Sequence, residues 1–376
     1  MKLDKATVGD VDRQCFAVFD GRGETLPLAD LAEDLLKRQK ENWPGLAEGY
    51  AALEAIRIRE IRGDGWGVQV QFNPRRILSS GAKLDPESIR RRPCFLCLGN
   101  LPPEQQAIRY REDYLILCNP APIFQGHLTI AHRRHLPQSL PDNMLTLLRL
   151  AADFGPGMTV FYNGPHCGAS APDHLHFQAA PAGLMPVEEE ILDPRKRIGV
   201  RRRAGVKIYG TAGLGRGILV IEGEEEETVS SLVGELIEAL GRLTGSATRN
   251  PRPAGTASLP GSPALRAGSI ASSTGEPLLN MLCRHTGEGW RLILFPRRKH
   301  RPDAYFREDT GKLLISPGAV DMGGIIITPR EEDFLALTPD LVSGIFREVA
   351  FDDMAVDALL TLLSQPPVKD QGQFLT

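Results

Sequence analysis

Apolar and polar residues alternate over short stretches of the first half of the chain. Val68, Val70 and Phe72 alternate with polar residues within 67–73, and this period of two predicts a strand. The same reasoning on apolar runs and helical spacing predicts further strands at 114–118, 127–131 and 158–162, and helices at 28–40 and about 142–154. The order strand, strand, helix, strand, strand predicts an antiparallel sheet with a helix packed on one face, an α+β fold.

The most unusual polar pattern is the run His174-Leu-His176-Phe-Gln178. Because alternate side chains of a strand share a face, the two imidazoles and the amide project to one side, while Leu175 and Phe177 face the core. A neutral imidazole suits nucleophilic attack on phosphorus, and an adjacent amide can hydrogen-bond the phosphoryl oxygens. The alternatives are strand histidines with ordinary hydrogen bonds, or a metal-binding pair.

A second group of residues has the composition of a metal site. Cys94 and Cys97 are separated by two residues, a spacing that lets both thiolates reach one ion. With His135 and His174 they form a closed tetrahedral set, which predicts a structural zinc ion and not a catalytic one. The alternative is that the cysteines are merely small buried residues.

Together these motifs resemble the histidine triad superfamily of nucleotide hydrolases and transferases. Between residues 94 and 181 the chain has Cys-x-x-Cys, Tyr-Arg-Glu-Asp-Tyr, Gly-His-Leu-Thr-Ile followed by a histidine, Asn-x-Gly and His-x-His. Asn163 stands thirteen positions before His176, the spacing of the family's active-site asparagine and nucleophile. Gln178 at the third triad position resembles the transferase branch, which includes galactose-1-phosphate uridylyltransferase, diadenosine tetraphosphate phosphorylase and GDP-L-galactose phosphorylase.

This resemblance implies roles for individual residues. His176 is expected to be the nucleophile, Gln178 and Ser170 to hold the non-bridging phosphate oxygens, and Asn163 to orient the loop or the phosphate. Ser170 stands six positions before His176, one more than the uridylyltransferase pattern gives, so this loop departs from the family. The polar turn that follows 67–73 resembles a substrate-binding stretch of the transferase branch and offers three basic candidates, Arg75, Arg76 and Lys83.

The family's transferases are tandem duplications whose second half has lost the nucleophile, and the second half of this chain fits that pattern. The apolar run 279–285, followed by 291–302, is similar to 114–119 followed by 127–137. The stretches 313–316 and 324–328 are the candidates for the later strands, and no second His-x-His-x-Gln run follows them. The alternative is a coincidence between short apolar strands that end in basic residues.

We expect four parts from these patterns. They are a histidine-triad-like half with the zinc site and the nucleophile (1–190), a connecting β/helix segment (191–244), a flexible insertion rich in Gly, Pro, Ser and Ala (245–277), and the remainder of a degenerate second half (278–376). The insertion has few large apolar residues, so we expect it to be dispensable.

Composition limits the possible partners. The 376 residues carry a net charge of −3, which gives no general attraction to nucleic acid or to an anionic membrane. Local basic clusters are expected to be solvated surface, with one or two binding phosphates, and they lie at 75–76, 90–92, 195–197, 201–203 and 297–299. With six cysteines, no apolar N-terminal leader and no long apolar run, we expect a cytoplasmic protein without a membrane segment. A homodimer is compatible with this interpretation.

The leading hypothesis is a nucleotidyltransferase or phosphorylase that acts on a nucleoside-diphosphate sugar or a dinucleoside polyphosphate, with phosphate or a sugar phosphate as acceptor. The second hypothesis is a hydrolase of the same superfamily, against which Gln178 argues because an amide cannot shuttle protons to water. The third is a zinc-stabilised protein that binds nucleotides or RNA without turnover, against which the intact His-x-His pair argues.

Overall fold

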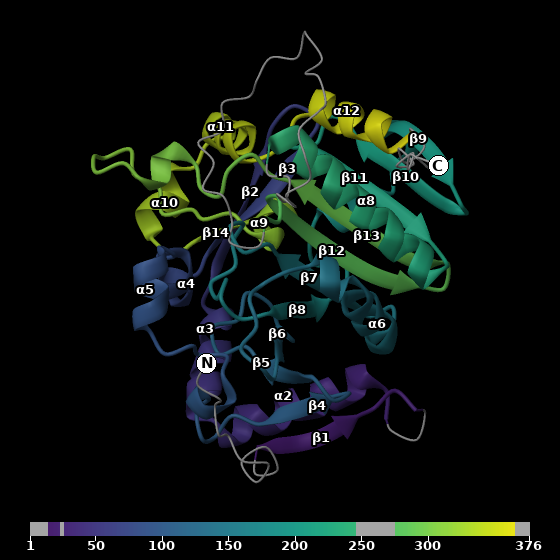
Figure 1. Cartoon of the computed structure of the whole chain (residues 1–376). Coiled ribbons are helices and arrows are strands. Elements are labelled where there is room, and N and C mark those ends of the chain that lie inside the picture. Colours follow the sequence, from purple (N-terminus) through teal and green to yellow (C-terminus); the bar gives the residue numbers. More distant parts are fainter. Residues whose placement is uncertain (1–13, 23–25, 246–274, 365–376) are drawn as a thin grey trace.

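The computed structural model describes residues 14–22, 26–245 and 275–364, so nearly all of the predicted insertion lies outside the described residues. A mixed sheet of eleven strands runs through the molecule in the order β1-β4-β5-β6-β8-β7-β12-β13-β11-β10-β9 (Figure 1). Its strands are β1 (Cys15–Phe19), β4 (Ala107–Tyr110), β5 (Tyr114–Cys118), β6 (Leu128–His132), β7 (Met158–Asn163), β8 (His176–Pro181), β9 (Arg197–Arg203), β10 (Val206–Thr211), β11 (Ile218–Gly223), β12 (Leu279–Thr286) and β13 (Gly289–Pro296).

The sheet contains two halves with the same topology. In the first half, β4, β5 and β6 are followed by helix α6 (Met144–Phe154), and then by β7 and β8, with β8 lying between β6 and β7. In the second half, β9, β10 and β11 are followed by helix α8 (Glu226–Thr244), and then by β12 and β13, with β13 lying between β11 and β12. The halves join where β7 pairs with β12, and only β1 and β4 pair in parallel within this sheet. The predicted α+β class with tandem halves is confirmed.

The detailed correspondence predicted for the second half is wrong. β12 and β13 occupy the places of β7 and β8, and not those of β5 and β6. The stretch 313–316 is no strand, and 324–328 supplies β14 (Ile325–Thr328) of a separate small sheet. The segment 191–244, expected to be a connecting β/helix segment, contains strands and a helix as expected, and its β9, β10, β11 and α8 belong to the second half of the sheet. An apolar run identifies a strand but not its place in the sheet, which explains the error.

Helices cover one face of the large sheet. Residues of α2 (Leu28–Asn42), α3 (Pro44–Glu54), α6, α8 and α12 (Asp353–Ser364) share one buried cluster with the strands. The other α-helices in the described ranges are α4 (Ile77–Ser80), α5 (Pro86–Arg91), α7 (Val187–Glu190), α9 (Ala319–Met322), α10 (Glu331–Ala336) and α11 (Pro339–Val349). No helix in the described ranges is long and apolar enough to cross a membrane.

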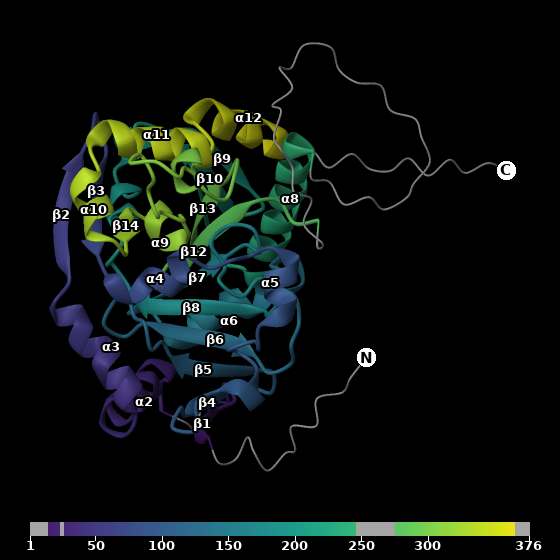
Figure 2. The same ribbon diagram turned by 90° about the vertical axis from the view of Figure 1, so that its left-hand side faces the viewer.

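A three-stranded sheet covers part of the other face. It has the order β14-β3-β2, with β2 (Arg57–Arg62) antiparallel and β14 parallel to β3 (Gly67–Phe72). Its apolar residues form a second buried cluster with the large sheet and with residues of α9, α10 and α11. Figure 2 shows β2, β3 and β14 beside α9 and α10, next to the strands of the large sheet. The candidate site lies on this side.

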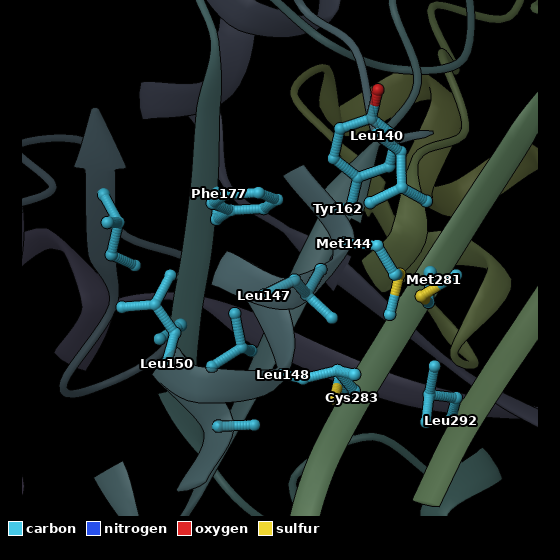
Figure 3. Close-up of a cluster of buried hydrophobic side chains, with 14 of the residues drawn as sticks. Leu140, Met144, Leu147, Leu148, Leu150, Tyr162, Phe177, Met281, Cys283 and Leu292 are labelled. Atoms are coloured by element: carbon cyan, nitrogen blue, oxygen red, sulfur yellow. The ribbon is translucent and has the colours of Figure 1, made fainter. Parts of the chain in front are cut away.

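Packing on the helical face fixes the orientation of β8. Leu147, Leu148 and Ala151 of α6 recur at helical spacing and are fully buried. Figure 3 shows α6 side chains packed between Phe177 of β8 and Met281 of β12. Because Phe177 faces these residues, the side chains that alternate with it point to the opposite side of the sheet.

Candidate active site

A cavity of about 560 Å³ lies beside β8, against the N-terminal end of that strand. Its wall includes the predicted residues Asn163, Ser170, His176, Gln178, Arg75 and Arg76. Lys83 is exposed and does not line this cavity. The C-terminal segment also contributes, through Ser316 and residues 318–321. The wall of the cavity therefore combines residues from the N-terminal and the C-terminal parts of the chain.

His176 is the first residue of β8 and is 4% exposed. Its Nδ1 lies 2.8 Å from the backbone oxygen of His174, and because a carbonyl only accepts, Nδ1 carries the proton. Nε2 is then left with a lone pair. Burial lowers the pKa of His176, which favours this neutral imidazole. The backbone oxygen of His174 thus fixes the tautomer of His176 and leaves Nε2 as its basic nitrogen.

Gln138 holds the backbone around His176. Its Oε1 accepts from the His176 amide at 2.8 Å, and its Nε2 donates to the backbone oxygens of His176 at 3.0 Å and Asn163 at 2.8 Å. The side chain is fully buried. One amide thus ties the start of β8 to the end of β7, which keeps Asn163 and His176 in a fixed relation.

The orientation of Gln178 is determined by His127. The Ile123 amide donates to His127 Nδ1 at 3.2 Å, so the imidazole proton sits on Nε2, which lies 2.9 Å from Gln178 Oε1. Burial, and next the charge of Arg76, lower the pKa of His127 to about 3, which keeps it neutral. Since the oxygen of Gln178 accepts from His127, its amide nitrogen is the group left to donate into the cavity.

Asn163 is oriented in the same way. Its Oδ1 accepts from Asn280 Nδ2 at 2.8 Å and from the Ala319 amide at 2.7 Å. A backbone N–H cannot accept, so the atom facing Ala319 must be the oxygen, and Asn163 Nδ2 is available to a ligand in the cavity. The side-chain amides of Asn163 and Gln178 therefore both present donors to the cavity that His176 also lines.

The basic candidates differ in their surroundings. Arg76 Nη1 donates to the Ala121 backbone oxygen at 2.9 Å, and burial lowers its pKa to about 10, which still leaves it protonated near neutral pH. Arg75 is exposed and lies 3.2 Å from Glu48. The backbone oxygen of Ser170 accepts from Arg92 Nη2 at 2.7 Å, which ties this loop to the wall of the cavity.

The four predicted metal ligands converge. One ligand atom each of Cys94, Cys97, His135 and His174 lies within 4.8 Å of the others. His174 Nδ1 is 3.3 Å from Cys94 Sγ, and His135 Nδ1 is 3.2 Å from Cys97 Sγ. Ligands about 2.1–2.3 Å from a central ion lie roughly 3.5 Å apart in a tetrahedron, so the arrangement fits a Cys2His2 metal site.

The outer nitrogens of both histidine ligands also face acceptors. His174 Nε2 is 2.7 Å from the backbone oxygen of His132, and His135 Nε2 is 3.5 Å from Asp173. Partners of this kind fix the ring orientation of metal-bound histidines. His174 precedes β8 and does not lie within it, so the predicted single reactive strand carries only His176 and Gln178.

Several site residues were missed by sequence reasoning. His127 follows a glycine and lies just before β6, on the same alternation as Thr129, which pairs with Gln178; this alternation was a usable signal. Gln138, Asn280 and Ala319 reach the site through long-range contacts, for which the sequence has no local signal.

The comparisons with known proteins concern mainly the fold. A family profile described as "Domain of unknown function (DUF4922)" matches residues 35–181. No curated protein matches significantly. Among solved structures, yeast Ap4A phosphorylase Apa2 is similar with a TM-score of 0.52 and 15% identity, over 87% of this chain and 97% of that chain. The chain has the fold of this phosphorylase.

The structure of the same yeast enzyme in complex with AMP is equally similar, with a TM-score of 0.52 and 15% identity, over 85% of this chain and 97% of that chain. An ADP-glucose phosphorylase from Arabidopsis thaliana is matched with 14% identity over 79% of this chain and 100% of that chain, but its TM-score of 0.30 supports no structural conclusion. The chain thus shares its fold with an Ap4A phosphorylase, one of the proteins to which its motifs were similar.

Proposed function

We propose that the protein is a nucleotidyltransferase or phosphorylase that works through a covalent nucleotidyl-His176 intermediate. The observation that carries this proposal is the arrangement of donors around one imidazole. Neutral His176 has its lone pair on Nε2, and the amide groups of Asn163 and Gln178 are both turned so that nitrogen is left for the cavity. Such donors suit the non-bridging oxygens of an α-phosphate.

In the first step, the Nε2 lone pair of His176 attacks the α-phosphorus. An N–P bond forms, and the bond to the bridging oxygen breaks, so that the leaving phosphate departs with the electron pair. The ring becomes cationic, and the His174 carbonyl that accepts from Nδ1 at 2.8 Å stabilises this charge. A phosphate leaving group needs no proton near neutral pH.

In the second step, an oxygen of the acceptor attacks the same phosphorus, and the N–P electron pair returns to Nε2. Gln178 cannot act as a general base toward water, whereas a phosphate dianion needs no such help. We therefore favour orthophosphate or a sugar phosphate as acceptor. The substrate class we propose is a nucleoside-diphosphate sugar or a dinucleoside polyphosphate, in keeping with the fold shared with an Ap4A phosphorylase.

The metal site is proposed to hold zinc in a structural role. Two thiolates and two imidazoles are a donor set that zinc favours, and four protein ligands leave no position for substrate. When bound, the ion would hold the loop that leads into β8. Cys94 and Cys97 precede β4, while His174 lies two residues before the nucleophile, so the site ties these segments together.

The test is a substrate panel of Ap4A, ADP-glucose, GDP-glucose and UDP-glucose, each incubated with and without orthophosphate or a hexose 1-phosphate. We expect consumption to be much faster with an acceptor, with ping-pong kinetics and a nucleotide product that carries the acceptor's phosphate. Cleavage to the nucleoside monophosphate at the same rate without acceptor would replace the transferase proposal by the hydrolase alternative. Binding without any turnover would favour the binding-protein alternative.

A further inference from the structure

The contact between the two halves of the sheet lies directly beside the proposed nucleophile. Asn163 at the end of β7 is the cross-strand partner of Asn280 on β12. Both side chains are buried, Asn163 with 7% exposed and Asn280 with none. Their amides meet through the 2.8 Å bond from Asn280 Nδ2 to Asn163 Oδ1. A residue of the half without a nucleophile therefore touches the proposed phosphate-binding amide.

The orientation of Asn280 is itself determined. Its Oδ1 lies 2.5 Å from Nη1 of Arg297, and a guanidinium only donates, so the oxygen must face Arg297. Asn280 Nδ2 then donates to Asn163 Oδ1 and to the Cys167 backbone oxygen at 2.5 Å. Each amide in the series from Arg297 to Asn163 thus has a single favourable orientation.

Arg297 is suited to hold this series in place because it is fully buried and bonded to several segments. Besides Asn280, it donates to the backbone oxygens of Val349 at 2.9 Å, Pro317 at 2.9 Å and His300 at 2.9 Å. These carbonyls come from three parts of the C-terminal region. The bond to Pro317 also places the start of α9, whose Ala319 amide is the second donor to Asn163.

The close approach of Gly318 completes the arrangement. A Cβ atom at Gly318 would lie 3.0 Å from Asn163 Oδ1, which is tighter than an ordinary contact. Gly318 itself lies against the loop after β7, since a Cβ on Gly168 would lie 2.6 Å from the Gly318 Cα. The C-terminal segment is therefore fitted closely against the oxygen side of the Asn163 amide.

We propose that Asn280 and Arg297 are positioning residues for nucleotidyl transfer, which act by fixing the Asn163 amide with its nitrogen toward the α-phosphate. This inference rests on the proposed function. The oxygen side of Asn163 faces donors only, so a reversed amide would place N–H against N–H at Ala319. The second half thus takes part in the reaction through orientation, without touching the substrate.

A double-mutant cycle tests the inference. The variants are Asn163→Ala, Asn280→Leu and their combination, assayed with the panel substrate that the wild-type protein consumes fastest. We expect Asn163→Ala to lower kcat by about 100-fold, as for loss of an oxyanion donor, and Asn280→Leu by about 10-fold. In the Asn163→Ala background, Asn280→Leu should have no further effect, because its role passes through Asn163.

Asn280→Asp is the second variant, in case the leucine variant does not fold. It keeps the shape and the bond from Arg297 but sets a carboxylate oxygen against Asn163 Oδ1, so kcat should again fall only when Asn163 is present. Trp290→Phe is the matched control, because Trp290 Nε1 on β13 donates to the Leu148 backbone oxygen of α6 at 2.9 Å, a contact between the two halves that lies away from the cavity. It should lower the melting temperature without lowering kcat.

If the wild-type protein is active and the losses of kcat in the two single variants multiply in the double variant, the positioning role is overturned and the proposed function stays intact. A wild-type protein that consumes no member of the panel, with or without acceptor, would overturn the proposed function and the positioning role together. A loss of kcat in Trp290→Phe equal to that in Asn280→Leu would also overturn the inference, because it would show that weakening any contact between the halves lowers kcat.

Discussion

The two halves of the large sheet share one strand order but use their fifth strands differently. On β8, His176 and Gln178 line the cavity, whereas on β13 Ile293 and Phe295 belong to the apolar cluster beneath the small sheet. Topology therefore repeats while chemistry does not. The second half instead contributes the environment of the site, through Asn280 and the segment near Gly318.

The difference extends to the metal site. Within the described residues, the group of four converging cysteine and histidine ligands occurs once, in the first half, and it includes His174. In the second half, the buried guanidinium of Arg297, which directly follows β13, bonds to Asn280 and holds the segments near the site. Converging thiol and imidazole groups before β8 in the first half thus contrast with a buried, hydrogen-bonded arginine after β13 in the second.

The largest expected effect concerns His176, the proposed nucleophile. His176→Ala should lower turnover at least about 10³-fold and abolish the covalent adduct, with the fold intact, because no other group replaces the attacking Nε2. The measurement is mass spectrometry of the labelled peptide together with steady-state rates. His285→Ala, which removes an imidazole packed on Trp290 in the second half, is the control and should keep full activity. An adduct on any other residue contradicts the assignment.

The metal prediction compares cysteines of the two halves. Cys97→Ser should remove bound zinc and lower the melting temperature by about 5 °C or more, because binding free energy contributes to folding. Cys283→Ala, at a buried cysteine on β12, should leave the zinc content unchanged. Elemental analysis and thermal denaturation measure both quantities. A protein without zinc, with the same melting temperature in Cys97→Ser, would rule out the site.

A smaller effect is expected for the pH dependence of stability. The folded pKa of His127 is lowered to about 3, below its ordinary value of 6.5, so between these values the unfolded chain binds the extra proton. Stability from this group is complete above about pH 6.5 and is lost as the pH falls toward 3. The glutamine of His127→Gln does not titrate. The free energy of unfolding of this variant should therefore fall less steeply with decreasing pH than that of the wild-type protein, by up to about 1.4 kcal/mol per pH unit within this window.

Denaturant unfolding at pH 7, 6 and 5 checks this prediction. Identical slopes for the wild-type protein and His127→Gln would show that His127 is not held neutral in the fold. Because Gln178 loses its rigid partner in this variant, a decrease in turnover is expected beside the change in slope.

The sequence predicted the first half much better than the second. The strands 114–118 and 158–162 and the helix at 142–154 agree closely with β5, β7 and α6. Turns and polar residues, among them candidate site residues, mark the ends of these elements. β12 and β13 are apolar on both faces where they cross the core, so their pattern marks them as strands without assigning their positions.

The same limit applies to the site. His176, Gln178 and the four predicted metal ligands lie in short motifs, which can be recognised locally. Arg297 stood in a basic cluster expected to be exposed, yet it is fully buried, because its partners at Asn280, Pro317 and Val349 come from distant segments. An arginine whose hydrogen-bond partners are this distant in the chain leaves no local pattern in the sequence.

The smallest expected effect is the change in catalytic efficiency for Lys83, which contrasts with that for Arg76. Lys83 is exposed and does not line the cavity, so Lys83→Ala should change kcat/KM by less than about twofold. Arg76 lines the cavity close to His127, and Arg76→Met should raise KM by about tenfold or more, since a hydrogen bond to a charged group contributes about 1.5–3 kcal/mol. Steady-state kinetics on the best panel substrate, with melting temperatures for both variants, measures the contrast. Equal losses of kcat/KM in the two variants would contradict the prediction, because they would mean that the substrate extends beyond the cavity and contacts Lys83.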